Sequence, residues 1–452
     1  MDFNTIEKRL NALVESGKKG ELRGALSMLN EVDIAEYLAT LDNERVIMVF
    51  RLLPKDISAD VFSYMDSDQR TRLIDALGDQ EAMRIIDDMF VDDAVDLLEE
   101  LPAGVVRRLL KGADEEKRRL INQFLCYPEN SAGSIMTIEY MEFHRGVTVG
   151  EAMAEIRRTG VDKETIYTLY VIDEFRKLIG TVQLRKLLLA RDEQKIDEIM
   201  NEQVVSVTTV DDQEMVADTV RHYDLMSIPV VDKEGRLVGI ITADDIMDVI
   251  EDENTEDFEK MAAMTPSEDE YLKNSVLTLV KNRFPWLLIL MVSAMFTGLI
   301  ITHFEKSLLD WGTLGVALTS CMPMLMDTGG NCGSQASTLA IRALALGEIE
   351  LSDIGKVLWK EVRVAAIVGV SLATINFFRL WLFTSYGPAV AAVVSVTMCV
   401  TILLAKSIGC TLPILAKSIK LDPALMASPI ITTVVDAASL LILFSLARVV
   451  LG

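Results

Sequence analysis

A stretch beginning at Met322, MPMLMDTGGNCGSQASTLAIR, sets proline, aspartate, asparagine, glutamine and glycine in an apolar neighbourhood. Lipid offers no hydrogen bonds, so a polar, glycine-rich segment occurs within a membrane only where protein or a water-filled path provides hydrogen-bond partners for it. We therefore expect this stretch to line a permeation path, with Asn331 and Gln335 offering neutral oxygen atoms. For Asn331, an amide contact between packed helices is an equally good explanation.

A second polar intrusion is Asp436, near the middle of the last apolar segment. A carboxylate at mid-membrane costs about 2.5–3.5 kcal/mol on insertion scales, so it must face protein, water or a cation. Mg²⁺ prefers hard oxygen ligands and keeps several waters, so a magnesium site needs few carboxylates. Asp436 is thus the first candidate pore ligand. The alternative is a carboxyl that is protonated or bonded to a neighbouring helix, and Lys406 is the one candidate for an ion pair with it.

The composition of the chain is split. Its 452 residues carry a formal net charge of −24, and most charged residues lie within roughly the first 270. The remainder is dominated by aliphatic residues, which predicts an acidic soluble half attached to a membrane half. An acidic chain would repel nucleic acid and is compatible with binding cations. The five cysteines are scattered, which indicates neither a disulfide framework nor a zinc site. The polar N-terminus has no signal-peptide pattern, so we expect the soluble half in the cytoplasm.

Residues 1–132 show apolar residues at helical spacing and predict a helical N-terminal domain. The pair Leu53-Pro54 returns as Leu101-Pro102, which favours a solenoid-like stack of helices.

Residues 133–250 change to short β-branched runs, and a strand, turn, strand and helix occur twice. Asp173 and Asp232 occupy equivalent turns. This α/β repeat resembles a tandem pair of CBS domains, which often bind adenine nucleotides. Thr242-x-x-Asp245 resembles the ribose-contacting pattern of that family, whereas the other copy has Gln183-x-x-Lys186. Lysine cannot accept a hydrogen bond from a ribose hydroxyl, so the sequence leaves ATP binding open.

Residues 251–283 predict a long acidic connecting helix that leads to the membrane, with Thr265-Pro266 as a point of interruption. Residues 284–452 predict a transmembrane bundle of about five spans. Three apolar stretches, 286–302, 362–383 and 424–451, suit a membrane helix of roughly 20 residues. Two longer ones, 311–346 and 389–419, contain glycine or proline and predict spans that are broken, tilted or protruding.

Basic residues orient this bundle. Arg342, Lys356, Lys360 and Arg363 follow the second span, and Lys417 and Lys420 follow the fourth. The positive-inside rule therefore predicts a multi-pass protein of the cell's inner (plasma) membrane with its N-terminal domains in the cytoplasm and its C-terminus outside.

The order of helical acidic domain, CBS pair, acidic connector and about five spans resembles the MgtE family of magnesium channels and transporters. The sequence GGNCGSQ at 329–335 matches the family's GGNxGxQ signature, and Asp422-Pro423-Ala424 followed by Asp436 matches its last span. The resemblance implies a homodimer with one pore on the two-fold axis, in which Asp436 binds hydrated magnesium.

The same resemblance implies a cytoplasmic sensor in which Mg²⁺ bridges clustered carboxylates and closes the gate. These carboxylates correspond to Asp60, Asp92 and Asp96 in the helical domain, to Asp212, Glu214, Asp224, Asp245 and Asp248 in the CBS pair, and to Glu253, Glu256 and Asp257 in the connector.

Two other functions stay open. One is a broader permease for Co²⁺ or Mn²⁺, although the thiolate and imidazole ligands that softer metals prefer are missing from the expected path. The other is a membrane-anchored sensor whose CBS pair binds a nucleotide or a metal. No phosphate-binding loop or catalytic triad is visible, so we expect no enzyme. The roles of Asp327 and Glu361 are not predicted.

Overall fold

The computed structural model describes residues 3–267, 271–272, 274–426 and 428–451. The chain divides into two compact units, Met1–Ile250 and Glu251–Gly452.

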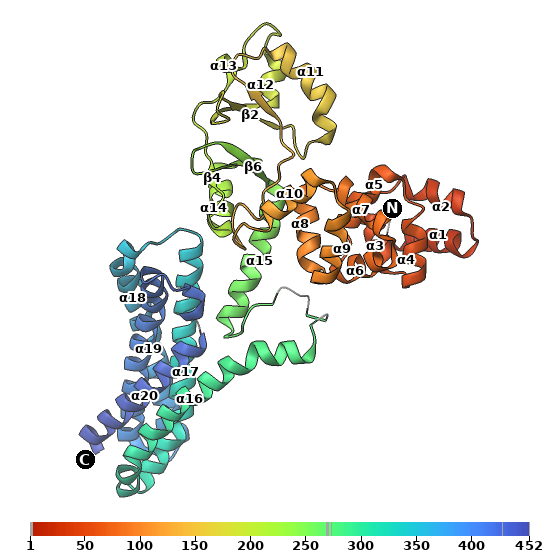
Figure 1. The fold of residues 1–452 in the computed structure, drawn as a ribbon. Coiled ribbons are helices and arrows are strands. Elements are labelled where there is room, and N and C mark those ends of the chain that lie inside the picture. Colours follow the sequence, from red (N-terminus) through yellow and green to blue (C-terminus); the bar gives the residue numbers. More distant parts are fainter. Residues whose placement is uncertain (1–2, 268–270, 273, 427, 452) are drawn as a thin grey trace. The chain divides into compact units, whose positions relative to one another are not determined.

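The first unit begins with ten short helices (Figure 1). They are α1 (Phe3–Glu15), α2 (Lys19–Leu26), α3 (Glu31–Ala39), α4 (Asn43–Phe50), α5 (Lys55–Ser63), α6 (Ser67–Ala76), α7 (Asp79–Asp88), α8 (Val91–Glu100), α9 (Ala103–Gly112) and α10 (Glu115–Phe124). From α3 onward each helix packs against the helix two further along the chain, as expected of a solenoid-like stack.

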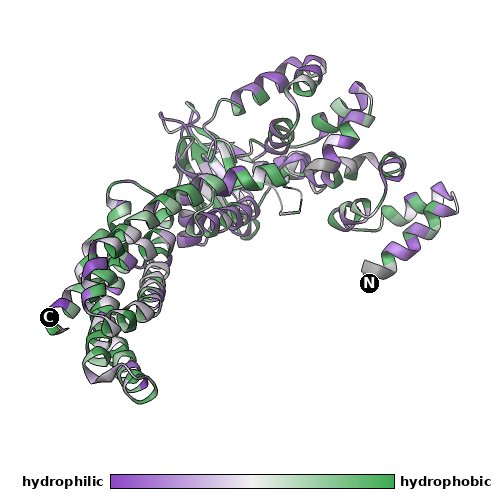
Figure 2. Ribbon diagram, turned by 90° about the horizontal axis from the view of Figure 1, so that it is seen from below, coloured by the Kyte–Doolittle hydropathy of each residue, from purple (hydrophilic) through white to green (hydrophobic). Residues whose placement is uncertain are grey.

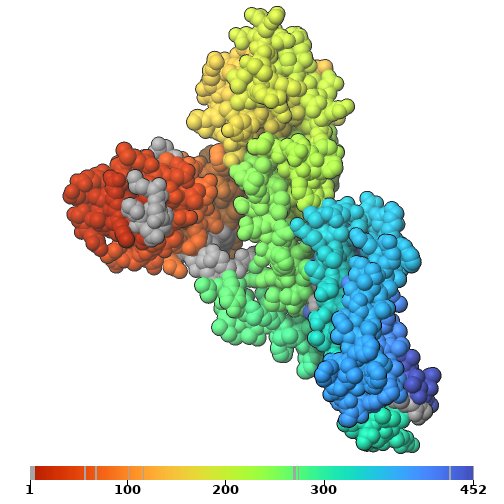
Figure 3. All heavy atoms as spheres, turned by 180° about the vertical axis from the view of Figure 1, so that it is seen from behind, coloured from red at the N-terminus to blue at the C-terminus, as the bar shows by residue number. Residues whose placement is uncertain are grey.

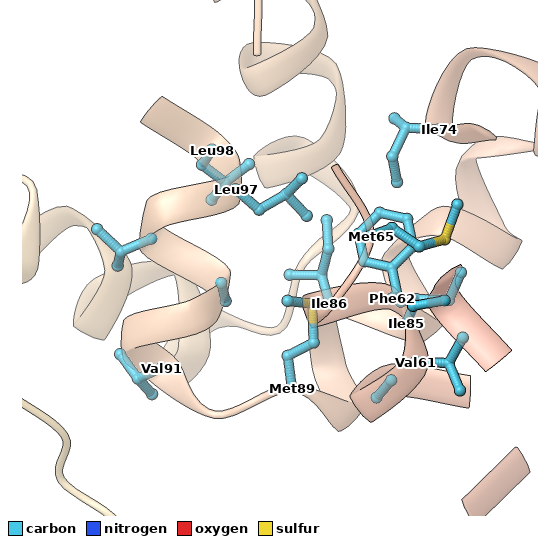
Figure 4. Close-up of a cluster of buried hydrophobic side chains, with 14 of the residues drawn as sticks. Val61, Phe62, Met65, Ile74, Ile85, Ile86, Met89, Val91, Leu97 and Leu98 are labelled. Carbon is cyan, nitrogen blue, oxygen red and sulfur yellow. The ribbon is translucent and has the colours of Figure 1, made fainter. Parts of the chain in front are cut away.

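Proline sets the recurrence in this stack. Pro54 and Pro102 are the N-cap residues of α5 and α9, where a missing N–H costs nothing. Leu53 and Leu101, just before them, are buried. Phe62, Ile86 and Leu97 lie in the core between the helices (Figure 4). The Leu-Pro repeat therefore marks equivalent helix starts.

Two three-stranded sheets follow, with strand orders β1-β2-β3 and β4-β5-β6. The first copy contains β1 (Glu142–His144), α11 (Val149–Thr159), β2 (Thr168–Ile172), β3 (Leu178–Gln183) and α12 (Leu184–Leu189). The second contains α13 (Ile196–Ile199), β4 (Val207–Thr208), α14 (Gln213–Tyr223), β5 (Ser227–Val231), β6 (Leu237–Thr242) and the start of α15 (Ala243–Met261). In each sheet the first pair of strands is parallel and the second antiparallel.

The two copies share a core, so they form one body. Tyr140 and Tyr170 of the first copy pack with Leu237 and Ile240 of the second. The segments before the copies also cross over, since Thr137 pairs with Ile240 and Asn201 pairs with Thr181. In Figure 3 the copies (yellow and yellow-green) form a continuous mass.

The second unit is a helical bundle. Its long helices are α16 (Val276–Asp310), α17 (Thr313–Ala345), α18 (Ile354–Phe383), α19 (Gly387–Ser418) and α20 (Ser428–Leu451). Among the residues that the structure describes, four segments, which contain α16, α18, α19 and α20, are long and apolar enough to cross a membrane. The fifth long helix, α17, carries the polar signature. Figure 2 shows these helices as mainly hydrophobic, which agrees with the expected bundle of about five spans.

Two expectations about the helices need correction. Residues 251–283 do not form one helix, because α15 ends at Met261 and α16 begins at Val276. Thr265 and Pro266 lie between them, where the sequence predicted an interruption. Of the three forms predicted for the second and fourth spans, which were broken, tilted or protruding, the structure excludes the broken one, because α17 and α19 continue through Pro323 and Pro413.

Candidate ion path and magnesium-sensing sites

Helix α17 has two different faces. Asp327, Asn331 and Gln335 follow one another at intervals of four residues, so they form one stripe. All three are exposed in the single chain. The helix-packing alternative for Asn331 therefore does not apply within this chain, and a polar stripe lies on the outside of a membrane bundle.

The opposite face of α17 carries the glycines of the signature. A Cβ at Gly329 would come within 2.7 Å of Thr401 in α19 and 2.8 Å of Val435 in α20. A Cβ at Gly409 of α19 would come within 2.3 Å of the Gly333 carbonyl oxygen. Backbone thus packs directly on backbone here, and any side chain would separate the helices. The glycines allow α17 to pack closely on α19 and α20, and this packing fixes the position of its polar stripe.

Helix α20 brings Asp436 to the same region. Thr432, one turn before Asp436, would contact a Cβ at Gly330 at 2.9 Å. The Asp436 side chain is partly buried, and the Asp327 carboxylate acts on it electrostatically. Lys406 does not provide the ion pair considered above, because its Nζ lies 3.3 Å from Glu361 Oε2. The structure therefore joins Asp436 to a second acid, Asp327, whose role the sequence did not predict.

In the first unit, Asp92 of α8 and Asp245 of α15 lie in one group of acids. Burial, and next the charges of Asp93 and Asp245, raise the pKa of Asp92 to about 8. One buried oxygen of Asp92 has no hydrogen-bond partner. Glu164 belongs to the same group, since burial and then Asp245 raise its pKa to about 7. Desolvated like charges of this kind favour protons or a cation.

Sequence reasoning found two members of this acidic group and missed the rest. Asp93 accepts a hydrogen bond from Ser63 Oγ at 3.2 Å. Glu139, in the segment between α10 and β1, acts electrostatically on both Asp92 and Glu164. Asp93 could have been found as the neighbour of Asp92, whereas no spacing rule places Glu139 or Glu164 beside α8. We refer to Asp92, Asp93, Glu139, Glu164 and Asp245 as the α8 acidic group.

The other sensor candidates of this unit lie in different places. Asp60 acts electrostatically on Asp93 and so lies near the α8 acidic group. Asp96 and Asp248 are exposed on α8 and α15.

Asp212 is the N-cap of α14 and accepts a hydrogen bond from the Glu214 N–H at 3.0 Å. Asp224 ends the same helix in a left-handed conformation with φ of 50°. An 11-residue helix is about 16 Å long, so Asp212 and Glu214 do not meet Asp224.

The connector acids lie beside the start of α20. Lys260 of α15 contacts Asp422 at 2.7 Å and Glu256 at 2.6 Å. Burial, and next the Asp422 carboxylate, raise the pKa of Asp257 to about 6; Glu253 and Glu256 act in the same direction. The structure therefore unites the three predicted acids with Asp422 and with a cation, Lys260, that the sequence did not single out.

The CBS pair contains a cleft that residues of both copies line. This cleft has a volume of about 580 Å³, and its lining includes Thr181 and Gln183 of the first copy and Asn201 and Asp224 of the second. The Thr242-x-x-Asp245 pattern of the second copy is already engaged, since Asp245 accepts hydrogen bonds from Thr242 and belongs to the α8 acidic group. Of the two patterns, only Gln183 lines the open cleft, and Thr242 and Asp245 are not among its lining residues.

Across the part of the chain that the structure describes, no three histidine, cysteine or acidic side chains converge in a way that could hold a metal ion. The acids described above influence one another electrostatically, but within the described residues they do not form a three-ligand metal site. Water-rich coordination is what Mg²⁺ tolerates best.

Comparisons with known proteins agree with this organisation. A family described as a divalent cation transporter matches residues 322–446, the MgtE intracellular N domain matches 29–130, and a CBS domain matches 196–252. The magnesium transporter MgtE of Thermus thermophilus is 36% identical over 98% of this chain and 99% of its own length. The chain belongs to the MgtE family. The MgtE of Bacillus subtilis is 29% identical over 99% of this chain and 98% of its own length.

Solved structures of MgtE soluble regions share the fold of the first part of the chain. The crystal structure of the soluble part of a magnesium transporter has 31% identity and a TM-score of 0.54 over 56% of this chain and 99% of its own. The cytosolic domain of the Mg²⁺ channel MgtE in complex with ATP has 36% identity and a TM-score of 0.51, over 54% and 99%. As a member of the MgtE family, the chain is a membrane transporter that handles divalent cations.

Proposed function

We propose that this protein lets Mg²⁺ enter the cell and that cytoplasmic Mg²⁺ closes the path. The observation that carries the proposal is the exposed stripe of Asp327, Asn331 and Gln335 on α17, next to Asp436 on α20. Carboxylate and amide oxygens are hard ligands, and a carboxylate among neutral oxygens suits a hydrated ion that must also leave.

The stripe also supports a homodimer. Polar groups exposed on a membrane bundle must meet protein or water, because lipid cannot satisfy them. A second copy related by a two-fold axis would present the same stripe, so the two stripes would enclose one path with two Asp436 carboxylates. We propose Asp436 and Asn331 as the residues that contact the ion there.

For gating, we propose that Mg²⁺ replaces protons and water between crowded acids. In the first unit the sensor is the α8 acidic group, with Asp60, Asp96 and Asp248 around it. In the connector it is Glu253, Glu256 and Asp257 beside Asp422. Like charges repel unless a divalent ion bridges them, so rising Mg²⁺ would favour the compact arrangement. For Asp212, Glu214 and Asp224 a magnesium role stays a prediction from the resemblance.

The basic residues at the ends of α17 and α19 support an orientation with the soluble unit in the cytoplasm and the C-terminus outside. The function needs no covalent chemistry, so we propose no enzymatic activity.

Two alternatives change the ion or the ligand. A Co²⁺ or Mn²⁺ permease would use the same path. The open cleft at Thr181 and Gln183 supports a regulatory nucleotide, and a relative's cytosolic domain binds ATP. In that case ATP would bind in this cleft without ribose contacts from the Thr242-x-x-Asp245 pattern.

The deciding experiment measures Mg²⁺ entry into proteoliposomes with a trapped indicator, while Mg²⁺ on the cytoplasmic face is varied. We expect entry in the parent, suppression by cytoplasmic Mg²⁺, and loss of entry in Asp436→Ala. Asp310→Ala is the control, because Asp310 is an exposed acid at the end of α16. If Asp436→Ala passes magnesium as well as Asp310→Ala does, the proposed path is wrong. Competition with Co²⁺ and Mn²⁺ in the same vesicles separates the broader permease.

A further inference from the structure

An ion pair lies inside the bundle, away from the residues assigned to the path. Lys406 of α19 and Glu361 of α18 are joined at 3.3 Å between Nζ and Oε2. Their side chains are only 7% and 14% exposed. Charges are rare within membrane helices because each is costly there, so a buried pair requires an explanation.

The pair lies next to the signature helix. The Ala405 carbonyl oxygen, one residue before Lys406, would be 3.3 Å from a Cβ on Gly333. Gly409, three residues after Lys406, touches the Gly333 backbone. The Lys406 charge also acts on Cys332, the residue after Asn331. Lys406 therefore leaves α19 where that helix meets the glycine face of α17, opposite to the polar stripe and at the same level along the helix.

A positive charge at this place opposes the passage of a cation. The interaction of two charges falls with distance and rises with charge, so a divalent ion feels twice the repulsion of a monovalent one. The low dielectric of a bundle interior screens it poorly. Glu361 places an opposite charge next to the ammonium, so the pair as a whole has no net charge.

We propose that Glu361 is a charge-compensating positioning residue for transport, which neutralises Lys406 so that the path beside α17 keeps its attraction for Mg²⁺. This inference rests on the proposed function. Cross-bracing of α18 and α19 is the simpler role of such a pair. The two roles predict different results for single substitutions. If the pair is only a brace, removing either Glu361 or Lys406 has the same effect. If Glu361 compensates charge, removing Glu361 leaves an unpaired positive charge, whereas removing Lys406 leaves a negative one.

The test is a set of variants in the proteoliposome assay, with thermal melting in detergent measured on each. We expect Glu361→Gln, which leaves Lys406 unpaired, to lower Mg²⁺ entry at least tenfold. Lys406→Gln and the double variant Glu361→Gln/Lys406→Gln should stay within threefold of the parent. Glu361→Asp, which keeps the charge, should also remain close to the parent.

A relocated charge provides a second test should Glu361→Gln fold poorly. Cys410 lies within the field of both Glu361 and Lys406, so Cys410→Asp in the Glu361→Gln background should return a carboxylate to Lys406 and restore entry at least threefold. Equal losses in Glu361→Gln and Lys406→Gln, in step with melting, would show a brace and overturn the inference. No rescue by Cys410→Asp in a folded variant would overturn it too. A parent that passes no Mg²⁺ overturns the proposed function itself, whereas a parent that conducts and an unaffected Glu361→Gln overturn this inference alone.

Discussion

Asp436 and Asp92 are both partly buried carboxylates, but their surroundings differ. Among the described residues, Asp327 is the acid that acts on Asp436, and the helix that carries Asp436 packs on the glycines of α17. Asp92 lies among several acids, in a place where burial and like charge together raise its pKa to about 8. A sparse site suits an ion that must leave again, whereas a crowded site changes its energy strongly when an ion arrives. If the proposed function holds, the number of neighbouring acids is what separates the ion path from the sensor within one chain.

The largest effect should come from the packing beneath the membrane site. Gly409→Leu would drive a side chain into the Gly333 backbone, so we expect a fall of about 10 °C or more in melting temperature in detergent, together with loss of Mg²⁺ entry. Gly298→Leu is the control, because nothing lies within 4 Å of a Cβ there. Hydrogen exchange of α8 should keep its response to Mg²⁺ in Gly409→Leu. If that response also vanished, the two sites would not be separable.

The next effect concerns the α8 acidic group and pH. In the folded unit Asp92 holds its proton up to about pH 8, whereas in unfolded chain it loses the proton near pH 4. Its contribution to stability is therefore present at low pH and is lost as pH rises through this window. Without Mg²⁺, we expect the protection factors of the α8 amides, corrected for the intrinsic exchange rate at each pH, to fall between pH 5 and pH 8. We expect Asp92→Asn to stabilise α8 by about 1–3 kcal/mol at pH 8.

Magnesium should remove most of this pH dependence in the parent, because the ion compensates the ionised carboxylates. Exposed Glu129→Gln is the matched control and should behave as the parent. A parent whose α8 amides have equal protection factors at pH 5 and pH 8 would show that the α8 acidic group is not crowded in solution.

A smaller effect is expected at the connector. Lys260→Met removes the cation that contacts Asp422 and Glu256, so without Mg²⁺ the amides at the end of α15 should exchange roughly threefold to tenfold faster, a loss of about 1 kcal/mol. Millimolar Mg²⁺ should restore protection by taking the place of the ammonium. Lys281→Met, an exposed lysine of α16, is the control. Unchanged exchange without Mg²⁺ would mean that Lys260 does not hold α15.

The smallest effect separates a helix cap from a magnesium ligand at Asp212. Asp212→Ala should lower stability by about 1 kcal/mol through loss of the cap, whereas Asp212→Asn should preserve it. Both should leave the Mg²⁺ concentration for half-closure within twofold of the parent. A shift in Asp212→Asn, which keeps the cap but loses the charge, would instead make Asp212 part of the sensor.

Much of the fold could be predicted because local patterns repeat. The Leu-Pro recurrence marks helix starts, and strand, turn and strand recur in the CBS copies. The acidic connector was predicted as a long helix with an interruption at Thr265-Pro266. Proline indicated the region of the break, but helical periodicity did not show that α15 already ends at Met261, where Ala263 adopts a positive φ of 54°.

The sites divide in the same way. Asp436 and Asn331 could be chosen because a polar residue in an apolar run is conspicuous in sequence. The partners Glu139, Glu164 and Lys260 could not, because tertiary packing alone brings them beside acids distant in the chain. The sequence indicated Lys406 as a candidate partner for an intramembrane acid, but only the packing of α18 on α19 shows that this acid is Glu361.

The spacing of the α17 stripe also has a geometric consequence. Residues four apart follow a ridge inclined by about 26° to the helix axis, so Asp327, Asn331 and Gln335 run obliquely around α17. A stripe that crosses the bilayer along its normal therefore requires the helix to lean by about that angle. The 33 residues of α17 measure about 50 Å, and a helix of that length at this slope rises about 45 Å, close to the full thickness of a bilayer with its headgroups.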